Sequence, residues 1–420
     1  MSELSHVYPL GSRVNDRGHL ELGGCDAVAL AREFGTPAYV VVEDDLRARA
    51  RAFADALAAR HRDYDVLFAS KAFPCTAVYR VLADEGLACD VASGGELALA
   101  LSAGFDAERT YMHGNAKSED ELREALAAGV GHIVLDSLHE IDRLAALAAQ
   151  AAIRQDVLIR VTPGVSGDTH HAISTGQADS KFGFSLDQAR EAIAVLDGHP
   201  WLNLQGLHFH IGSQLFELAP FRAAVRAIAS LGSFPVYNLG GGLAAAYTPD
   251  QQPPSPERWV ETIVDAVHSE LGPDTRLLLE PGRALVANST VTLYTVQTIK
   301  RNVSTWVAVD GGMSDNLRPM MYGARYEAVI ADRFLAPGDT ACHVAGKHCE
   351  SGDVIVRDAH LSAPAPGDVV VTPATGAYGY AMANNYNGVC RAPVVFVRDG
   401  EARVVVRRET YADLMSRDVG

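Results

Sequence analysis

The sequence predicts an α/β fold, in which a (β/α)8 barrel of the TIM type is followed by a C-terminal antiparallel β-domain. Short apolar segments alternate with amphipathic helical segments between residues 64 and 280, and this alternation is typical of such a barrel. After Pro281 the pattern changes to apolar runs bounded by Gly, Pro and Asp, as in a β-rich domain. We therefore expect a barrel over 36–285 and a β-domain over 286–420. Residues 1–35 are expected to form part of the β-domain.

Eight apolar segments are the expected barrel strands. They are VLFA (66–69), ACDVA (88–92), RTYMH (109–113), HIVLD (132–136), VLIRVT (157–162), LQGLHFH (204–210), PVYNL (235–239) and RLLLE (276–280). Three of the intervening helices begin with a capping-box pattern, in which Ser118, Ser137 and Ser185 precede Glu121, Glu140 and Gln188 by three residues.

Six further runs are the expected strands of the β-domain. They are LVANSTVTLYTVQTI (285–299), TWVAVDGG (305–312), DVIVRD (353–358), GDVVVTP (367–373), APVVFV (392–397) and ARVVVRR (402–408). Residues 1–35 precede the barrel, and we expect them to add a strand to this second domain.

Composition narrows the class of protein. The chain has 420 residues, of which 48% are hydrophobic and 21% are charged, as in an ordinary soluble globular protein. The net charge of −16 argues against a general nucleic-acid binder or a partner of anionic membranes. Neither a signal peptide nor a membrane-spanning apolar run is evident. The six cysteines are scattered, so we expect a reduced, cytoplasmic protein.

Ionisable residues are concentrated where the expected barrel strands end. In barrels of this kind the chemistry takes place at the carboxyl ends of the strands. The residues at these ends are Lys71, Asp90, His113, Asp136, Thr162, His210, Gly240 and Glu280. We interpret His113 and Asp136 as mainly structural, because Asp136 leads into the Ser137 cap and His113 can be a satisfied loop histidine.

The last two strand ends predict a phosphate site. Gly240, Gly241 and Gly242 follow the seventh strand, and EPGR (280–283) follows the eighth. Loops at these two positions often bind phosphate through backbone N–H groups. A phosphate site, a lysine and a carboxylate together indicate pyridoxal 5′-phosphate, whose aldehyde binds a lysine and whose ring nitrogen pairs with a carboxylate. Lys71 and Glu280 are placed for these roles.

At this point the motifs resemble a known family, the fold-type III pyridoxal-phosphate-dependent amino-acid decarboxylases, which have an alanine racemase-like barrel. The resemblance is closest to the diaminopimelate decarboxylases and covers nearly the whole chain. It is carried, in order, by FASKAFP, CDVASGGELALALSAGF, MHGNAKS, KFGF, GLHFHIGSQ, NLGGGL, EPGR, DGGMSDNLRPMMYGARYEA, AGKHCESGD and TGAYGYAMANNYN. Two stretches depart from the family pattern, GGGLAAAY and Ala116 in HGNAKS.

The resemblance implies a role for each candidate residue. Lys71 would carry the cofactor, His210 would stack on its ring and Glu280 would pair with the ring nitrogen, and these three would be catalytic together with Cys349. The other cofactor contacts would come from Asp90, Ser213, Gly240, Gly241, Gly242, Gly282, Arg283 and Tyr378. The substrate would be bound by Arg283, Arg318, Tyr322, Glu350 and Tyr378.

The implied reaction is the decarboxylation of meso-2,6-diaminopimelate to L-lysine and CO2, the last step of lysine biosynthesis. Cys349 is the candidate donor of the proton that replaces the carboxylate. Arg318 suits the distal carboxylate, because guanidinium binds carboxylate in a bidentate manner, and Glu350 would read the distal ammonium. Cys349 and Glu350 would enter from the second subunit of a homodimer, so that each active site is shared across the interface.

Three alternatives remain open at this stage. A related decarboxylase would act on ornithine, lysine or a carboxylated polyamine. A decarboxylase-like regulatory protein would lack catalysis, although Lys71, His210, Glu280, Cys349 and Tyr378 are all present. A metal-dependent barrel hydrolase would use His208 and His210, the loop pair His170 and His171, or CHVAGKHC (342–349). The first pair, however, lies on the sixth strand where such enzymes use the first, the loop pair has no obvious carboxylate partner, and CHVAGKHC fits no standard spacing, so we expect no metal.

Overall fold

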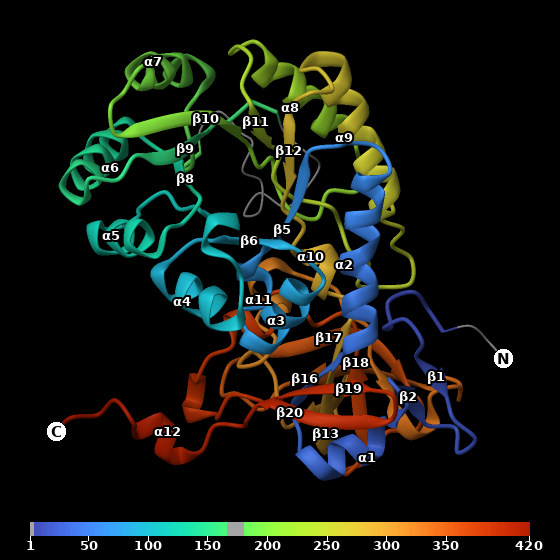
Figure 1. The fold of residues 1–420 in the computed structure, drawn as a ribbon. Coiled ribbons are helices and arrows are strands. Elements are labelled where there is room, and N and C mark those ends of the chain that lie inside the picture. The colour runs from blue at the N-terminus through green and yellow to red at the C-terminus, as the bar shows by residue number, and fades with distance from the viewer. Residues whose placement is uncertain (1–3, 166–179) are drawn as a thin grey trace. The chain divides into compact units, whose positions relative to one another are not determined.

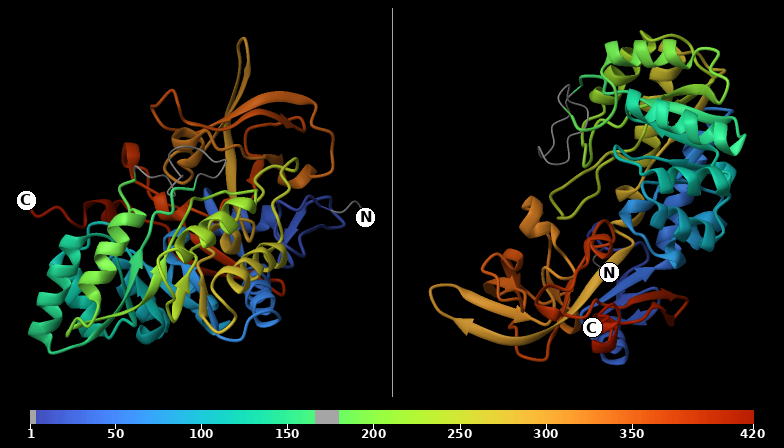
Figure 2. Two further views of the ribbon diagram at one scale, coloured as in Figure 1. Left: turned by 90° about the horizontal axis from the view of Figure 1, so that it is seen from above. Right: turned by 90° about the vertical axis from the view of Figure 1, so that its left-hand side faces the viewer.

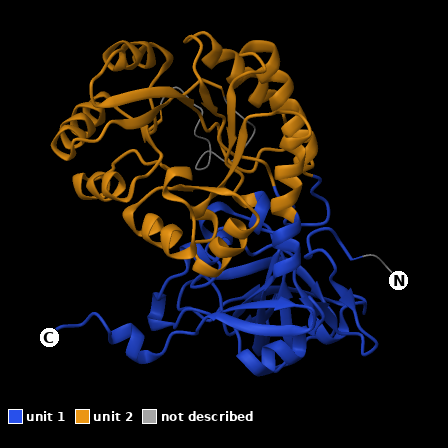
Figure 3. Cartoon of the chain, in the orientation of Figure 1, with its two compact units in different colours: residues 1–48, 245–252, 284–420 blue, residues 49–244, 253–283 orange. Residues whose placement is uncertain are grey.

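The computed structural model describes residues 4–165 and 180–420. The chain divides into two compact units (Figure 3). The first, which we call the β-unit, comprises 1–48, 245–252 and 284–420, and the second, the barrel unit, comprises 49–244 and 253–283. Among the described residues, no helix is both long and apolar enough to cross a membrane.

The barrel unit contains a closed barrel of eight parallel strands, as the sequence predicts (Figure 1). Each of the eight expected segments forms one strand, and neighbours in the chain are neighbours in the barrel. The strands are β5 (Tyr64–Ala69), β6 (Ala88–Val91), β7 (Thr110–Met112), β8 (His132–Leu135), β9 (Gln155–Arg160), β10 (Leu202–His208), β11 (Val236–Asn238) and β12 (Arg276–Leu279).

Helices alternate with these strands, as in the expected fold. They are α2 (Glu43–Ala58), α3 (Thr76–Asp84), α4 (Gly94–Ala103), α5 (Glu119–Ala128), α6 (Leu138–Ala151), α7 (Leu186–Leu196), α8 (Ala219–Ala229) and α9 (Pro256–Glu270). A short 3-10 helix, η2 (Ala107–Arg109), precedes β7.

The helix starts follow the predicted caps, with one difference. Ser118 and Ser185 form complete capping boxes at α5 and α7. Ser137 also caps α6, but Glu140 does not return to it. The Glu140 carboxylate instead accepts the N–H of Asp136 at 2.8 Å and pairs with the Nζ of Lys117 at 2.8 Å. A buried lysine needs an anion more than the cap needs a second hydrogen bond.

The barrel interior is filled by one apolar side chain from each of seven strands. These side chains are Leu67, Ala88, Tyr111, Val134, Leu158, Val236 and Leu278. The eighth strand, β10, has Gly206 in register with Leu158 and Val236. A Cβ at Gly206 would lie 1.7 Å from the carbonyl oxygen of Val236, so the close approach of β10 and β11 depends on this glycine.

The β-unit is built on a nine-stranded sheet. Its strands are β4 (Ala38–Val42), β13 (Thr290–Arg301), β14 (Thr305–Val309), β15 (Val329–Ile330), β16 (Thr340–Ala345), β17 (Val354–Leu361), β18 (Val369–Thr372), β19 (Val394–Arg398) and β20 (Glu401–Val406). The long hairpin of β13 and β14 extends the sheet, and it is drawn in gold in Figure 2. The helices here are α10 (Arg283–Val286), α11 (Arg318–Tyr322) and α12 (Tyr411–Met415), with η4 (Ala331–Arg333), η5 (Tyr380–Met382) and η6 (Tyr386–Gly388).

This sheet differs from the purely antiparallel one that we expected. Two of its pairs, β14 with β16 and β4 with β19, run parallel. The expected start of the barrel domain at residue 36 also lies too early, because β4 pairs with β13 and β19 and therefore belongs to the β-unit. Residues before it form a separate sheet of β1 (Arg13–Val14), β2 (Leu20–Leu22) and β3 (Cys25–Asp26), then α1 (Ala27–Phe34).

The glycine in β10 provides a test of the barrel packing. We expect Gly206→Ala to destabilise the protein by at least about 1–3 kcal/mol, because the new methyl group would overlap the backbone of β11. Urea unfolding monitored by circular dichroism measures this loss. Gly95→Ala is the matched control: a Cβ there meets no atom closer than 3.8 Å, so this helical position should keep or gain stability. Equal stability of the two variants would contradict the packing argument.

Candidate active site

The barrel unit brings the predicted cofactor residues to the carboxyl ends of its strands. Lys71 lies in the 3-10 helix η1 (Ser70–Ala72) directly after β5, and Asp90 lies at the end of β6. Four more strand ends supply the remaining residues, which are His113 after β7, His210 and Ser213 after β10, Gly240, Gly241 and Gly242 after β11, and Glu280, Gly282 and Arg283 after β12. Residues far apart in the chain are thus collected at one end of the barrel.

Lys71 is exposed to solvent and interacts electrostatically with two groups of this cluster. Burial and the nearby Glu280 carboxylate raise the pKa of Asp90 well above its usual range, while the Lys71 ammonium opposes the rise. Burial and the same ammonium hold the pKa of His210 well below its usual value. Lys71 is therefore a cation of this end of the barrel, and His210 is neutral beside it.

Glu280 is a buried carboxylate that contacts one amide and two imidazoles. Its Oε1 lies 2.6 Å from Asn238 Nδ2 and 2.8 Å from His113 Nε2, and its Oε2 lies 3.3 Å from His208 Nε2. Although burial opposes its charge, the two histidines hold the pKa of Glu280 well below its usual range. Glu280 is therefore ionised, and His113, which we interpreted from sequence as mainly structural, contacts it directly.

The glycine run after β11 is required by close backbone contacts. A Cβ at Gly240, Gly241 or Gly242 would lie 2.3, 2.1 or 2.5 Å from a backbone oxygen of Phe209, Glu280 or Gly212. The N–H of Gly241 donates to His210 Nδ1 at 3.2 Å. His210 therefore carries its proton on Nε2, and the backbone of the glycine run fixes the orientation of its ring.

Ser213 and Arg283 form a second polar pair at this end of the barrel. The Arg283 guanidinium donates to Ser213 Oγ from Nη2 at 2.8 Å and from Nε at 3.2 Å. Gly282, beside the arginine, would place a Cβ 2.8 Å from the Cβ of Ala69. The turn after β12 therefore packs tightly against the end of β5, where Lys71 follows.

Several residues that the sequence did not single out belong to this cluster. Arg160 ends β9, is buried and interacts with Asp136, Glu280 and Asp90, and burial lowers its pKa. The sequence could have indicated this role, because Arg160 stands within the apolar segment VLIRVT and a buried guanidinium needs anions nearby. Asn238 gave no comparable signal within PVYNL.

The buried pair Lys117–Glu140 was also missed, although Lys117 stands in the HGNAKS motif. Its Nζ donates to the carbonyl groups of Gly114 at 2.6 Å and Val134 at 2.8 Å in addition to contacting Glu140. These bonds tie the loop that follows His113 to β8 and α6. Asp136, interpreted as structural, accepts the N–H of Gly183 at 3.0 Å.

The β-unit holds the residues predicted to bind the substrate, except Arg283, which ends the barrel unit. Arg318 and Tyr322 begin and end α11, and the spacing of four residues places them on one face of the helix. Arg318 is buried, its guanidinium lies 4.3 Å from the ring centre of Tyr247, and its Nη1 donates to the hydroxyl of Tyr326. Within the described parts of the chain its Nε is buried without a hydrogen-bond partner. Tyr247, at the end of GGGLAAAY, was not predicted.

Cys349 and Glu350 lie on an exposed loop of the β-unit that is held by a buried carboxylate. Asp353 Oδ2 accepts both the backbone N–H of His348 at 2.9 Å and its Nδ1 at 2.6 Å, and Asp353 Oδ1 accepts the N–H of Met313 at 2.7 Å. The N–H of Cys349 donates to Asn387 Oδ1 at 2.8 Å. The loop is thus exposed and anchored at once, and its cysteine is unpaired.

Tyr378 adopts a backbone conformation that tyrosine rarely takes. Its φ is +64°, in the left-handed region that favours glycine. The preceding Gly376 would place a Cβ 1.8 Å from the carbonyl oxygen of Val286. This strain is of the kind found at ligand-binding sites, and it marks the TGAYGY segment as a functional candidate.

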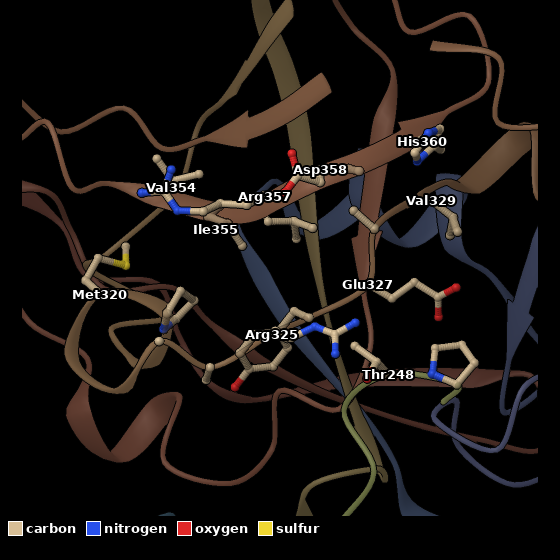
Figure 4. Close-up of a pocket in the computed structure, with 18 of the residues that line it drawn as sticks. Thr248, Met320, Arg325, Glu327, Val329, Val354, Ile355, Arg357, Asp358 and His360 are labelled. Carbon is tan, nitrogen blue, oxygen red and sulfur yellow. The ribbon is translucent and has the colours of Figure 1, made fainter. Parts of the chain in front are cut away.

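A separate cavity of about 740 Å3 lies in the β-unit (Figure 4). It is lined by 248–250, 319–320, 323–329, 352 and 354–360. None of the residues predicted from sequence lines it, although Tyr326, the partner of Arg318, does.

The metal-site alternative takes a different form in the structure. Among the described residues, the group that could hold a metal ion does not combine His208 with His210. It consists of His113, His208 and Glu280, whose possible ligand atoms lie within 4.8 Å of one another. All three residues are buried. His170 and His171 lie outside the described residues.

The residues of the barrel unit fit pyridoxal phosphate. An exposed lysine follows β5, a glycine run without side chains follows β11, and an ionised carboxylate is held after β12. An arginine and a serine, Arg283 and Ser213, suit an anion. These are the functional groups that a phosphate, a ring nitrogen and an aldehyde require.

Comparison with known proteins agrees with this chemistry. Residues 43–287 match the family described as pyridoxal-dependent decarboxylase, pyridoxal binding domain. The chain is 48% identical to the diaminopimelate decarboxylase of Actinosynnema pretiosum subsp. auranticum, covering 98% of this chain and 95% of the relative. It is 45% identical to that of Bacillus subtilis (strain 168), covering 97% of each.

Solved structures give the same result. The diaminopimelate decarboxylase of M. jannaschii in complex with L-lysine superimposes with a TM-score of 0.91 at 32% identity, covering 97% of this chain and 98% of that one. A lysine/ornithine decarboxylase of Vibrio vulnificus complexed with putrescine gives a TM-score of 0.76 at 25% identity, covering 88% and 97%. The fold class and the family predicted from sequence are confirmed: the chain belongs to the diaminopimelate decarboxylase family of pyridoxal-dependent decarboxylases.

Proposed function

We propose that the protein decarboxylates meso-2,6-diaminopimelate to L-lysine and CO2 with pyridoxal phosphate as cofactor. The observation that carries this proposal is the buried Arg318, whose Nε is a donor without a partner among the described residues. A guanidinium in this state suits a second carboxylate, and among the candidate substrates diaminopimelate has one that ornithine and lysine lack.

The barrel unit would hold the cofactor. Lys71 would bind its aldehyde, His210 would stack on the ring, and Glu280 would face the ring nitrogen. The phosphate would be held by Ser213 and the glycine run, with Tyr378. When bound, pyridoxal phosphate would accept the electron pair that remains when CO2 leaves.

The remaining steps would be carried by side chains of the protein. The Cα of the product must gain one proton in place of CO2, and we assign its delivery to the Cys349 thiol. Arg318, with Tyr322, would orient the substrate by its distal carboxylate, and Glu350 would pair with the distal ammonium. The exposed position of Cys349 and Glu350 supports the proposal that they serve the active site of a second subunit in a homodimer.

A related decarboxylase acting on lysine or ornithine is the second candidate. The structural similarity to the Vibrio vulnificus enzyme favours it as an alternative, but its identity to this chain is lower. The two candidates differ in whether a distal carboxylate is required.

The role of Lys71 is tested by trapping. Protein reconstituted with pyridoxal phosphate should show the visible absorbance of lysine-bound cofactor, and borohydride reduction should fix the label on the peptide that contains Lys71. Lys71→Ala should lack both signals, because no other amine is placed at the end of β5. Lys300→Ala, at an exposed lysine of β13, is the control and should keep both. A label on another lysine of the wild type would refute the assignment.

Substrate choice is tested with a panel of meso-diaminopimelate, lysine and ornithine. The wild type should release CO2 from diaminopimelate far faster than from the others. Arg318→Leu should lose roughly 2–5 kcal/mol of transition-state stabilisation on diaminopimelate, since a buried charged contact is removed, while its affinity for cofactor changes little. Arg325→Leu is the control, because that side chain is 70% exposed. Equal wild-type turnover of lysine and diaminopimelate would contradict the proposal.

Sharing of the active site is tested by mixing inactive variants. Lys71→Ala and Cys349→Ala homodimers should each be nearly inactive. After subunit exchange in equal amounts, about a quarter of wild-type activity should return, because half of the dimers regain one intact site. Exchange is verified by mass spectrometry, and a mixture of Lys71→Ala with Cys390→Ala serves as a control for the exchange conditions. If Lys71 and Cys349 of the same chain formed each site, mixing would restore no activity.

A further inference from the structure

The carboxylate of Glu280 is contacted by groups from three other strands. Asn238 is the last residue of β11, His208 is the last residue of β10, and His113 lies in the loop after β7. The side chains of His113, His208 and Glu280 are 9%, 1% and 6% exposed. Water therefore cannot replace these contacts, and the charge of Glu280 depends on its protein neighbours.

His208 acts as a neutral donor. Burial lowers its pKa to about 3, so the imidazole is uncharged at neutral pH. Its Nε2 lies against Glu280, and its Nδ1 is buried without a hydrogen-bond partner among the described residues. The Nε2–H tautomer therefore donates to the carboxylate without cancelling its charge. A protonated histidine would instead neutralise Glu280 and leave less charge for another cation.

A second buried carboxyl group, Asp90, lies in the same field. The pKa of Asp90 is raised and that of Glu280 is lowered. The two environments therefore separate the pKa values of the two carboxyl groups. No donor set like that of Glu280 surrounds Asp90 among the described contacts, although the backbone of Ser70 donates to it. The other charged or titratable groups that face Glu280 are Arg160 and His210, and Lys71 faces Asp90.

We propose that His113 and His208 are positioning residues for the decarboxylation. His208 donates a hydrogen bond to Glu280, and His113 lies in ion-pair contact with it at 2.8 Å. Through these contacts the two residues hold the carboxylate ionised and in one orientation, so that Glu280, and not Asp90, is the anion that serves the cofactor. This inference rests on the proposed role of Glu280 at the ring nitrogen. It assigns a function to His113, the first residue of HGNAKS, and to His208, the first residue of HFHIGSQ. Both would act through Glu280 and not by touching substrate or cofactor.

The test compares leucine with glutamine at each histidine. His208→Leu and His113→Leu remove the polar contact with Glu280, whereas His208→Gln and His113→Gln keep an N–H group, and neither leucine nor glutamine titrates. In the holoenzyme, each leucine variant should shift the acidic limb of the pH profile of kcat/KM upward by about one unit, the effect of losing one hydrogen bond to a charged group. The glutamine variants should stay close to the wild type.

The cofactor-free full chain provides an independent measurement. The depressed pKa of Glu280 contributes stability that is present above its unfolded-state pKa and is lost as the pH falls through the folded-state pKa. A leucine variant loses this contribution. Its unfolding equilibrium constant should therefore exceed that of the matching glutamine variant roughly tenfold at pH 8, and the difference should shrink only below about pH 4, as the pH falls through the depressed folded-state pKa. If His208→Leu does not fold, His113→Leu provides the same comparison.

Three results would overturn the inference. Identical pH profiles for leucine and glutamine variants, with an altered profile for Glu280→Gln, would remove the histidine roles and leave that of Glu280. An unaltered profile for Glu280→Gln would remove the proposed role of Glu280 as well. One equivalent of zinc or another divalent metal in the wild-type protein, lost in both glutamine variants, would show that the imidazoles are metal ligands.

Discussion

A carboxylate buried inside a protein stays ionised only if enough donors reach it, and Glu280 depends on this constraint. Its polar contacts come from β10, β11 and the loop after β7. Of these strands only β11 lies next to β12 in the barrel, since β10 is separated from β12 by β11, and β7 by β5 and β6. Only a closed barrel of fixed register lets His113 reach the carboxylate. The charge of the site is thus a consequence of barrel closure.

The same principle separates the two carboxyl groups of the site. Asp90 and Glu280 are both buried, and like charges at short range cannot both be stable. The donors collect at Glu280, so Asp90 has the raised pKa although Lys71 lies nearby. Lys71 then meets a neutral His210 and an Asp90 that favours its neutral form.

The β-unit uses buried carboxylates for a different purpose. Asp315 accepts the N–H of Gly312 at 2.8 Å and the hydroxyl of Tyr294 at 2.6 Å, and burial raises its pKa to about 7. Asp353 accepts Met313 and His348 in the same manner. These two side chains fix the loops before Arg318 and around Cys349. Side chains on loops can be positioned closely when their backbone N–H groups are tied to rigid acceptors.

The sequence predicts well what depends on neighbours in the chain, and less well what depends on distant strands. The eight barrel strands follow from local periodicity, and the residues at their ends follow from the barrel rule, so Lys71 and Glu280 could be located. The contact of His113 with Glu280 could not be located, because it depends on the barrel register. β16 was missed for a related reason: TACHVA alternates weakly, and it pairs in parallel with β14, where Trp306 pairs with His343, 37 positions later in the chain (343 − 306 = 37). A contact between strands that are far apart in the chain cannot be predicted from the sequence of either strand alone. Most of the contacts around Glu280 are of this kind.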